Sequence, residues 1–192
     1  MKNVAIFASG SGTNAQAIIK YLNKGSIGRV IYVLCNKNDA YVLERAKKYN
    51  VPTYVFNRNE FHNTYNIRDL LVKNKIDLIV LAGFLWLVPQ YLISSFPDRI
   101  INIHPALLPK YGGKGMYGMI VHDTVLRNKE KESGITIHFV DEHYDEGNII
   151  FQAKCKVEQK DTPESLAEKI HALEYKHFPR IVEEVLENQN NK

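Results

Sequence analysis

The sequence predicts an α/β fold whose sheet is mostly parallel, with antiparallel strands in its carboxyl-terminal half. Two patterns in the 192 residues indicate this class. In the first half, short and nearly all-apolar runs alternate with segments of helical periodicity, which is typical of βαβ units whose strands are covered on both faces. In the second half, an alternating segment is followed after a short link by a further strand, which favours an antiparallel pair.

The first half contains four candidate strands and three candidate helices. The strands are apolar runs at residues 4–8, 30–35, 53–56 and 78–82. The helices place apolar residues three and four positions apart and span residues 14–24, 40–49 and 61–75. We expect the crossovers between these parallel strands to be right-handed.

The second half begins with a strand at residues 100–103 and a long loop at residues 105–118, which contains two prolines and four glycines. Long loops of this kind are uncommon in compact domains and are often functional. Thr162 is suited to cap a final helix that carries Pro163 in its first turn. The remaining elements are a helix at 121–128, strands at 134–140 and 148–157, the final helix to about 187, and a frayed polar tail at 188–192.

Length and composition predict a single domain over residues 1–192, because 45% of the positions are hydrophobic and domains usually hold roughly 100–200 residues. Cys35 and Cys155 form no CxxC motif, so we expect two small core residues in a reducing compartment. The amino terminus lacks the features of a signal peptide, and the apolar runs are far shorter than the ~18 residues of a membrane helix. We therefore expect a soluble, cytoplasmic protein.

The net charge of +4 is too small to indicate a nucleic-acid partner by itself. Its distribution is uneven, since residues 1–96 hold 12 basic and 5 acidic side chains, whereas residues 97–192 hold 13 basic and 16 acidic ones. An anion-binding first half is one interpretation, and chance scatter over solvated surfaces is the other.

A glycine-rich segment, Ser9-Gly10-Ser11-Gly12-Thr13-Asn14, follows the first strand and opens a helix. Glycines let the backbone approach a ligand, and a helix amino terminus offers unpaired N–H groups to an anion. The segment predicts a phosphate site, with a simple tight turn as the alternative. Ala15 replaces the last glycine of the dinucleotide motif, and no acid for a ribose hydroxyl follows the second strand, so a nicotinamide cofactor is disfavoured.

Asn102 and His104 lie two apart at the end of a strand and therefore point to the same side of the sheet. Open α/β sheets bind ligands beyond the carboxyl ends of their strands. An amide donor and an imidazole at this place suit a developing oxyanion and a proton transfer. The alternative is that His104 is a structural histidine that caps the following loop.

Three further segments hold candidate site residues. Residues 138–147 combine four acids and two histidines, so a carboxylate there can fix the tautomer of an imidazole; the spacing disfavours a metal site. His171 and Glu174 share a face of the last helix, and spacing alone favours a solvent-facing pair. Residues 84–88 are apolar and fit either the core or a wall for a flat ligand ring.

Together these segments resemble the glycinamide ribonucleotide transformylase (phosphoribosylglycinamide formyltransferase) family, the folate-dependent formyltransferases of purine synthesis. The resemblance extends from about residue 3 to about residue 187. Asn102 and His104 with a downstream Asp145 are shared by the wider formyltransferase superfamily, whereas the glycine-rich loop and the short length are typical of this family. The matching segments are 10–14, 81–84, 102–105, 107–111 and 138–140.

The resemblance implies a Rossmann-like three-layer formyltransferase fold and a cleft for 5-phosphoribosylglycinamide and 10-formyltetrahydrofolate. Asn102, His104 and Asp145 would be catalytic. The substrate would be bound by Gly12, Thr13 and Asn14 at its phosphate and by Glu174 at its glycinamide end. The folate would contact Leu85, Trp86, Leu87, Val88 and Asn102, and Pro109 would follow a cis bond. The resemblance implies no metal, no nucleic-acid or membrane partner, and leaves a homodimer open.

The implied chemistry is attack of the substrate amine on the formyl carbon. Asn102 would donate a hydrogen bond to the formyl oxygen, and a protonated His104 would stabilise the charge that grows there. Asp145, as an anion, would keep His104 charged and help to move protons.

Four positions differ from the family pattern. Trp86 stands where many members have arginine. Thr64 occupies the nearest position to a second arginine that often follows the Phe61 region, and either Arg58 or Arg68 is a candidate substitute for that second arginine. The segment 112–118 replaces a Pro-Gly-x-His-x-His pattern and places Lys114 as a candidate anion contact. Residues 145–147 read Asp-Glu-Gly instead of Asp-Gly-Gly, which predicts a stiffer loop.

Other functions remain open at this point. A formyltransferase that acts on a sugar-nucleotide amine has a similar length. Enzymes that act on aminoacyl-tRNA, and formyltetrahydrofolate hydrolases, carry an extra domain for which 192 residues leave no room. A non-catalytic nucleotide- or folate-binding module is disfavoured, because all three candidate catalytic residues are present.

Overall fold

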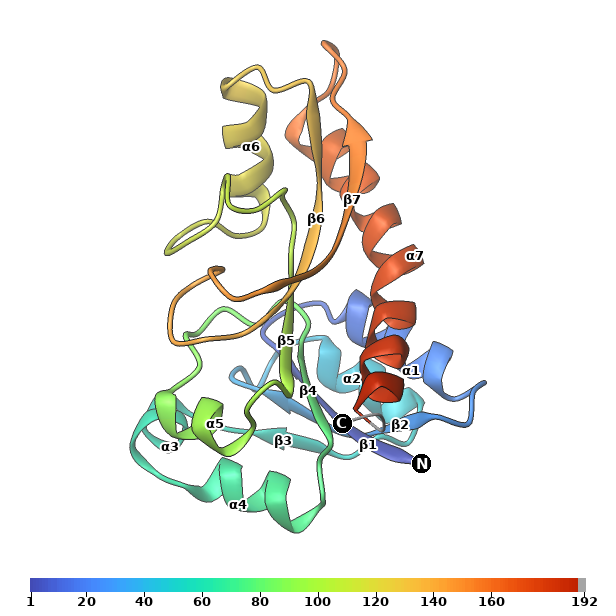
Figure 1. The fold of residues 1–192 in the computed structure, drawn as a ribbon, viewed down its shortest axis with the longest axis vertical. Helices are drawn as coiled ribbons and strands as arrows, with labels where there is room; N and C mark the ends of the chain where they lie inside the picture. Colours follow the sequence, from blue (N-terminus) through green and yellow to red (C-terminus); the bar gives the residue numbers. More distant parts are fainter. Residues whose placement is uncertain (190–192) are drawn as a thin grey trace.

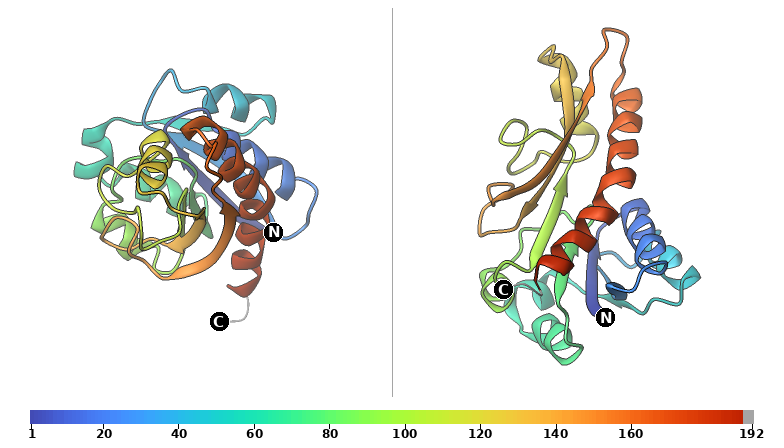
Figure 2. Two further views of the ribbon diagram at one scale, coloured as in Figure 1. Left: turned by 90° about the horizontal axis from the view of Figure 1, so that it is seen from above. Right: turned by 45° about the vertical axis from the view of Figure 1, so that its right-hand side comes forward.

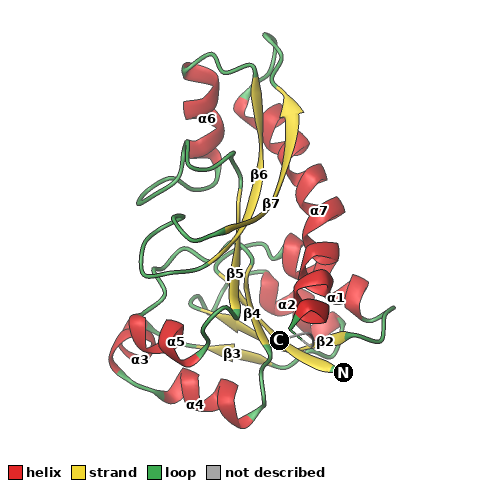
Figure 3. Ribbon diagram, viewed as in Figure 1, coloured by secondary structure: helices red, strands yellow, loops and turns green. Residues whose placement is uncertain are grey.

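A computed structural model of the chain describes residues 1–189. One seven-stranded sheet runs through it in the order β3-β2-β1-β4-β5-β6-β7 (Figure 1; Figure 3). The strands are β1 (Lys2–Ala8), β2 (Gly28–Cys35), β3 (Thr53–Val55), β4 (Leu78–Leu81), β5 (Ile100–His104), β6 (Glu132–Phe139) and β7 (Ile149–Lys156).

The sheet is parallel from β3 through β5 and antiparallel at β6 and β7. This arrangement confirms the predicted fold class. The antiparallel register of β5 and β6 pairs Asn102 with His138 and His104 with Thr136. Asn102 and His138 therefore lie opposite each other although they are far apart in the sequence.

Helices cover both faces of the sheet, which makes three layers (Figure 2). Buried side chains of α1, α2, α6 and α7 belong to one core cluster, and those of α3, α4 and α5 belong to a second cluster. The helices are α1 (Thr13–Leu22), α2 (Val42–Lys48), α3 (Arg58–Asn63), α4 (Asn66–Lys73), α5 (Gln90–Ser95), α6 (Met119–Arg127) and α7 (Pro163–Asn188).

Strand β1 shows why the central strands are continuous apolar runs. Val4, Ile6 and Ala8 pack into the first cluster, whereas Ala5 and Phe7 pack into the second. Successive side chains point to opposite faces of a strand, so a strand with helices on both sides needs an apolar residue at every position.

The structure corrects three details of the sequence prediction. Residues 61–75 form two helices, because Thr64 is extended and its hydroxyl donates to the Glu60 carbonyl at 2.8 Å, which ends α3. Helix α5 was not predicted, since its six residues are too few to show a period. Cys155 is only half-buried, because β7 is an edge strand, whereas Cys35 is fully buried as expected.

The final helix begins as predicted. Thr162 and Ser165 form a reciprocal capping box, and α7 continues to Asn188. Asn188 therefore belongs to the helix and not to the predicted tail, and residues 190–192 lie outside the described part of the chain. Between residues 1 and 189, no helix is both long and apolar enough to span a bilayer.

Candidate active site

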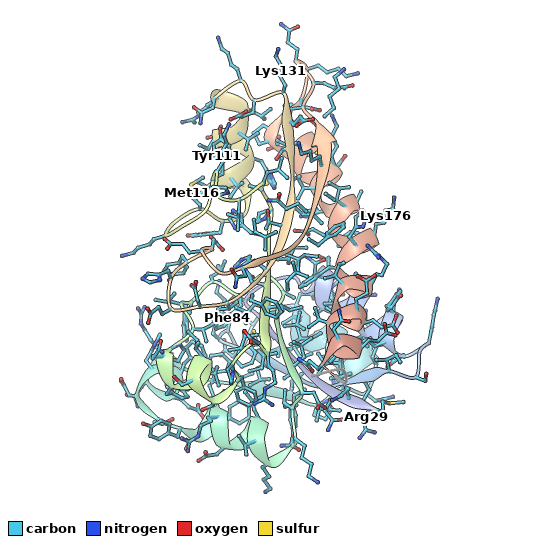
Figure 4. The ribbon with its side chains drawn as sticks, in the orientation of Figure 1. Arg29, Phe84, Tyr111, Met116, Lys131 and Lys176 are labelled. Atoms are coloured by element: carbon cyan, nitrogen blue, oxygen red, sulfur yellow. The ribbon has the colours of Figure 1, made fainter. Side chains whose placement is uncertain are left out.

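A cavity of about 620 Å³ opens at the carboxyl ends of β1, β4 and β5. The chain runs from β1 outward through β2 and β3 and then returns to the other side of β1 as β4, so the cavity lies at the switch point where α/β sheets bind ligands. Phe84, after β4, and Met116, from the loop before α6, both line it and are labelled in Figure 4.

Ser9 joins the two loops that form the floor of this cavity. Its backbone N–H donates to the Gly83 carbonyl at 3.0 Å, and its hydroxyl accepts a hydrogen bond from the Leu85 N–H at 3.2 Å. Ser9 is itself buried. The glycine-rich loop after β1 and the apolar segment after β4 are thereby held in a common position.

The glycine-rich loop exposes the amino terminus of α1 to the cavity. Gly12 precedes α1 with φ of 74°, and a Cβ atom at this position would lie 2.3 Å from Val42 Cγ2. No side chain caps the helix, so its first N–H groups stay available to an anion. Gly12, Thr13 and Asn14 all line the cavity, and a phosphate site at these residues stays a prediction.

Glu174 is the main difference from the expectation based on spacing. It is only 7% exposed, and Asn14 Nδ2 donates to its Oε2 atom at 2.8 Å. The prediction of a solvent-facing pair is wrong for Glu174, because α1 packs against α7, but holds for the exposed His171. Burial raises the pKa of Glu174, although the hydrogen bond from Asn14 and the charge of His171 act in the opposite direction.

His104 is 3% exposed, and its Nε2 atom lies 2.7 Å from the Tyr111 carbonyl oxygen. A carbonyl only accepts, so Nε2 carries the hydrogen and Nδ1 is the titrating nitrogen. Nδ1 lies 3.4 Å from Asp145 Oδ2. Burial lowers the pKa of His104 more than Asp145 and the Tyr111 carbonyl raise it. The free protein therefore favours a neutral imidazole, which corrects the expectation of a protonated His104.

Asp145 lies among the polar groups of this cluster. Asn102 Nδ2 donates to its Oδ1 atom at 3.4 Å and the Gly113 N–H donates to Oδ2 at 3.0 Å, while His138 Nε2 lies 3.5 Å from Oδ1. Burial by itself raises the pKa of Asp145, but these contacts and the nearby His104 outweigh it, so the pKa is lowered. Asp145 is therefore an anion at neutral pH.

His138 belongs to the same cluster, although no individual role was predicted for it. Its Nδ1 atom lies 2.8 Å from the Phe139 carbonyl oxygen, so Nδ1 carries the hydrogen and Nε2 accepts from Asn102 Nδ2 at 3.1 Å. His138 is 2% exposed. The alternating pattern of β6 could have indicated the face of the sheet on which His138 lies. Only the register with β5 places His138 opposite Asn102.

An aromatic wall borders the other side of the cavity. Leu85, Trp86, Leu87 and Val88 all line the cavity, as predicted. Trp86 contacts an aromatic cluster below it, formed by Phe56, Phe61, His62 and Phe84. The Arg58 guanidinium lies 5.9 Å from the Trp86 ring centre, whereas Arg68 pairs with Asp69 at 2.7 Å.

The long loop before α6 supplies backbone rather than side chains to the catalytic cluster. The Tyr111 carbonyl and the Gly113 N–H bind His104 and Asp145. Lys114 lines the cavity, and the Leu108–Pro109 bond is cis, as the resemblance implied. No group of three His, Cys, Asp or Glu side chains in the described residues has the arrangement of a metal site.

Comparison with known proteins identifies the family. Residues 2–182 match the family model described as formyl transferase. The chain is 34% identical to the phosphoribosylglycinamide formyltransferase of Bacillus subtilis, with 97% of this chain and 95% of that protein covered. It is 40% identical to the chloroplastic enzyme of the same name from Arabidopsis thaliana over 98% of its own length, and it spans 66% of that longer protein.

Solved structures agree with this result. The glycinamide ribonucleotide transformylase 1 of Symbiobacterium toebii superimposes with a TM-score of 0.89 at 35% identity, and the match covers 98% of this chain and 89% of that one. The sequence match agrees with the observed fold and with the cavity at the switch point. It also agrees with the arrangement of Asn102, His104 and Asp145. The chain belongs to the formyl transferase family, and its sequence and fold are similar to those of phosphoribosylglycinamide formyltransferases.

Proposed function

We propose that the protein transfers the formyl group of 10-formyltetrahydrofolate to the amine of 5-phosphoribosylglycinamide. One observation carries the proposal: Asn102 and His104 both contact Asp145 in the cavity that also contains the open amino terminus of α1. An anion site and an acyl-transfer site in one cavity suit a phosphorylated amine as the acceptor.

The acceptor would lie along the side of the cavity formed by α1 and α7. Its phosphate would bind the N–H groups at Gly12, Thr13 and Asn14. Its glycinamide end would approach Glu174, whose carboxylate can accept hydrogen bonds from the amide or the amine. Because Asn14 bonds directly to Glu174, the two ends of this subsite are held at a set separation.

The folate would lie against the aromatic wall. Leu85, Trp86, Leu87 and Val88 offer an apolar surface and backbone groups to a flat pterin ring. Arg58 lies beside Trp86 and is the better-placed substitute for the arginine that is absent near Thr64, because Arg68 already pairs with Asp69. We assign the anionic end of the folate to this side of the cavity.

Asn102, His104 and Asp145 have different roles in the proposed reaction. The amine nitrogen attacks the formyl carbon, and the carbonyl electrons move to the formyl oxygen. Asn102 Nδ2 donates a hydrogen bond to that oxygen in place of its 3.4 Å hydrogen bond to Asp145. His104 Nδ1 takes the proton that the amine loses, and the resulting imidazolium faces the Asp145 carboxylate. When the carbon–nitrogen bond to the folate breaks, the leaving nitrogen regains a proton, and formylated product and tetrahydrofolate result.

The assay is direct. The purified protein is mixed with both substrates, and formation of tetrahydrofolate is followed. We expect turnover that depends on 5-phosphoribosylglycinamide. Release of tetrahydrofolate without the acceptor would indicate a hydrolase, and turnover only with an aminosugar nucleotide would establish the alternative acceptor.

The remaining expectations are part of the same proposal. A formyltransferase of this kind would act in the cytoplasm on small molecules, with residues 1–192 as one domain. A homodimer stays a prediction, which analytical ultracentrifugation would test.

A further inference from the structure

His122 on α6 is a buried polar residue without a partner. Its side chain is 2% exposed and lines the active-site cavity. Its Nδ1 atom is fully buried and unpaired, and neither ring nitrogen makes a hydrogen bond to any residue between 1 and 189. Because Nδ1 is the enclosed nitrogen, Nε2 is the one that the cavity can reach.

An unpaired imidazole at this place is unexpected on energetic grounds. Nearly all buried polar groups in proteins are hydrogen-bonded, and a buried group left unpaired destabilises the structure. A ligand cannot reach the enclosed Nδ1 atom, but it can complete the imidazole at Nε2, the nitrogen that the cavity can reach. An unpaired Nε2 in the wall of a substrate cavity therefore indicates a substrate contact.

The surroundings of His122 limit the kind of group that it can bind. Burial lowers the pKa of His122 to about 4, with further contributions from His171 and His104. The imidazole is therefore neutral near pH 7 and offers one donor or one acceptor but no charge. A neutral contact suits a hydroxyl or an amide better than a phosphate dianion, for which α1 already provides a site.

Its position also separates it from the folate wall. His122 on α6 lines the same cavity as Glu174 of α7 and His104 of β5, and α6 packs against α7. A substrate held by its phosphate at α1, with its amine at His104, passes through this region. The folate wall at residues 85–88 comes from the segment after β4.

We propose that His122 is a substrate-binding residue that hydrogen-bonds a neutral hydroxyl or amide group of the acceptor, between its phosphate and its amine. The inference rests on the proposed function and adds a residue that determines acceptor affinity. Its role is to position the acceptor, and the folate is bound independently of it.

Steady-state kinetics of H122F and H122L test this role. Both variants keep an apolar volume in place of the ring and remove both nitrogens. We expect KM for 5-phosphoribosylglycinamide to rise roughly 10-fold, which corresponds to the loss of one neutral hydrogen bond. KM for 10-formyltetrahydrofolate and kcat should change less than about threefold, and H122Q should recover most of the lost affinity.

His177 provides a matched control. It also has a buried and unpaired Nδ1 atom, but it lies outside the cavity. H177F should leave both KM values unchanged. Circular dichroism verifies that each variant is folded, and the two apolar variants at residue 122 guard against a folding defect in one of them.

Two probes identify the group that is bound. An acceptor analogue with 2-deoxyribose should bind more weakly to the wild-type protein but not to H122F if the 2′-hydroxyl is the partner. An equal loss in both proteins excludes the 2′-hydroxyl and assigns the contact to the remaining hydroxyl or to the amide. Inhibition by inorganic phosphate should be the same in wild type and H122F.

Three results would overturn the inference: an unchanged acceptor KM in both apolar variants, an equal rise of the folate KM, or weaker inhibition by inorganic phosphate. If the wild-type protein is inactive with 5-phosphoribosylglycinamide, this result contradicts the proposed function instead. The wild-type activity is measured in the same experiment.

Discussion

His104 Nδ1 lies 3.4 Å from Asp145 Oδ2, while the opposite nitrogen of the same ring donates to the Tyr111 carbonyl. The ring is thus held with its titrating nitrogen toward the cavity and toward a carboxylate. The pKa of His104 is lowered by burial and that of Asp145 is lowered by its contacts, so a neutral base faces an anion. This pair is ready to accept a proton, because protonation at Nδ1 creates a favourable ion pair.

Replacing Asp145 by Asn should reduce kcat by roughly 10²–10⁴-fold with little change in melting temperature. The substitution keeps the volume but removes the charge that stabilises the His104 imidazolium. Glu146→Gln is the matched control, since Glu146 is exposed in the same link and should be neutral to mutation. A fully active Asp145→Asn protein would exclude this carboxylate from the mechanism.

Replacing Glu174 by Gln should separate activity from stability. Its pKa is raised by burial, so the folded state stabilises the protonated form, and this contribution is lost as the pH rises above the folded pKa. At pH 7 the neutral Gln should therefore give an equal or higher melting temperature, while KM for the acceptor rises roughly 10-fold. Exposed Glu168→Gln on the same helix should change neither quantity. A lower melting temperature for the Glu174 variant would contradict this account.

Two glycines of the α1 loop should respond differently to alanine. At Gly12 the φ of 74° and the 2.3 Å approach to Val42 both oppose a Cβ atom, whereas at Gly10 no atom lies within 4 Å of that position. We expect Gly12→Ala to lower the free energy of unfolding by about 1–3 kcal/mol and to weaken phosphate binding. Urea denaturation and inhibition by inorganic phosphate measure the two effects. Gly10→Ala should resemble wild type, and equal effects at both positions would refute the explanation.

His122 should make stability depend on pH in the acid range. Its folded pKa of about 4 lies below the ordinary value of 6.5, so the unfolded chain binds more protons between these values. Stability should be full above pH 6.5 and should fall by roughly 3 kcal/mol as the pH drops toward 4. Urea denaturation of wild type and H122F at several pH values tests this. The variant should show a shallower dependence, and identical slopes would show that His122 does not titrate in this way.

Trp86 should report folate binding. It is the single tryptophan of the chain and lines the cavity at the aromatic wall. Binding of a folate analogue should change its emission after correction for absorbance, whereas 5-phosphoribosylglycinamide alone should leave it nearly unchanged. The reverse pattern would place the two ligands on opposite sides of the cavity from those proposed.

Several site residues could be predicted because local patterns contain them. Gly12 follows an apolar strand and opens a helix, and Asn102 and His104 share one side of a strand that ends in a long loop. Their placement around one cavity follows from the rule that parallel strands direct their carboxyl ends to the same edge. Glu174 was different: its spacing on α7 indicated a solvent-facing residue, and only the packing of α1 on α7 buries it.

The sequence by itself determined the α/β class, the order of the strands along the chain, and the candidates that lie within or directly after single elements. These features depend on periodicity and on residues that are neighbours in the chain. The tertiary structure alone decided which distant groups meet: His138 with Asn102 through the β5–β6 register, Asp145 with the Gly113 N–H, and the unpaired His122 at the cavity. It also decided the protonation of His104, because burial and the distance to a carboxylate are properties of the assembled fold.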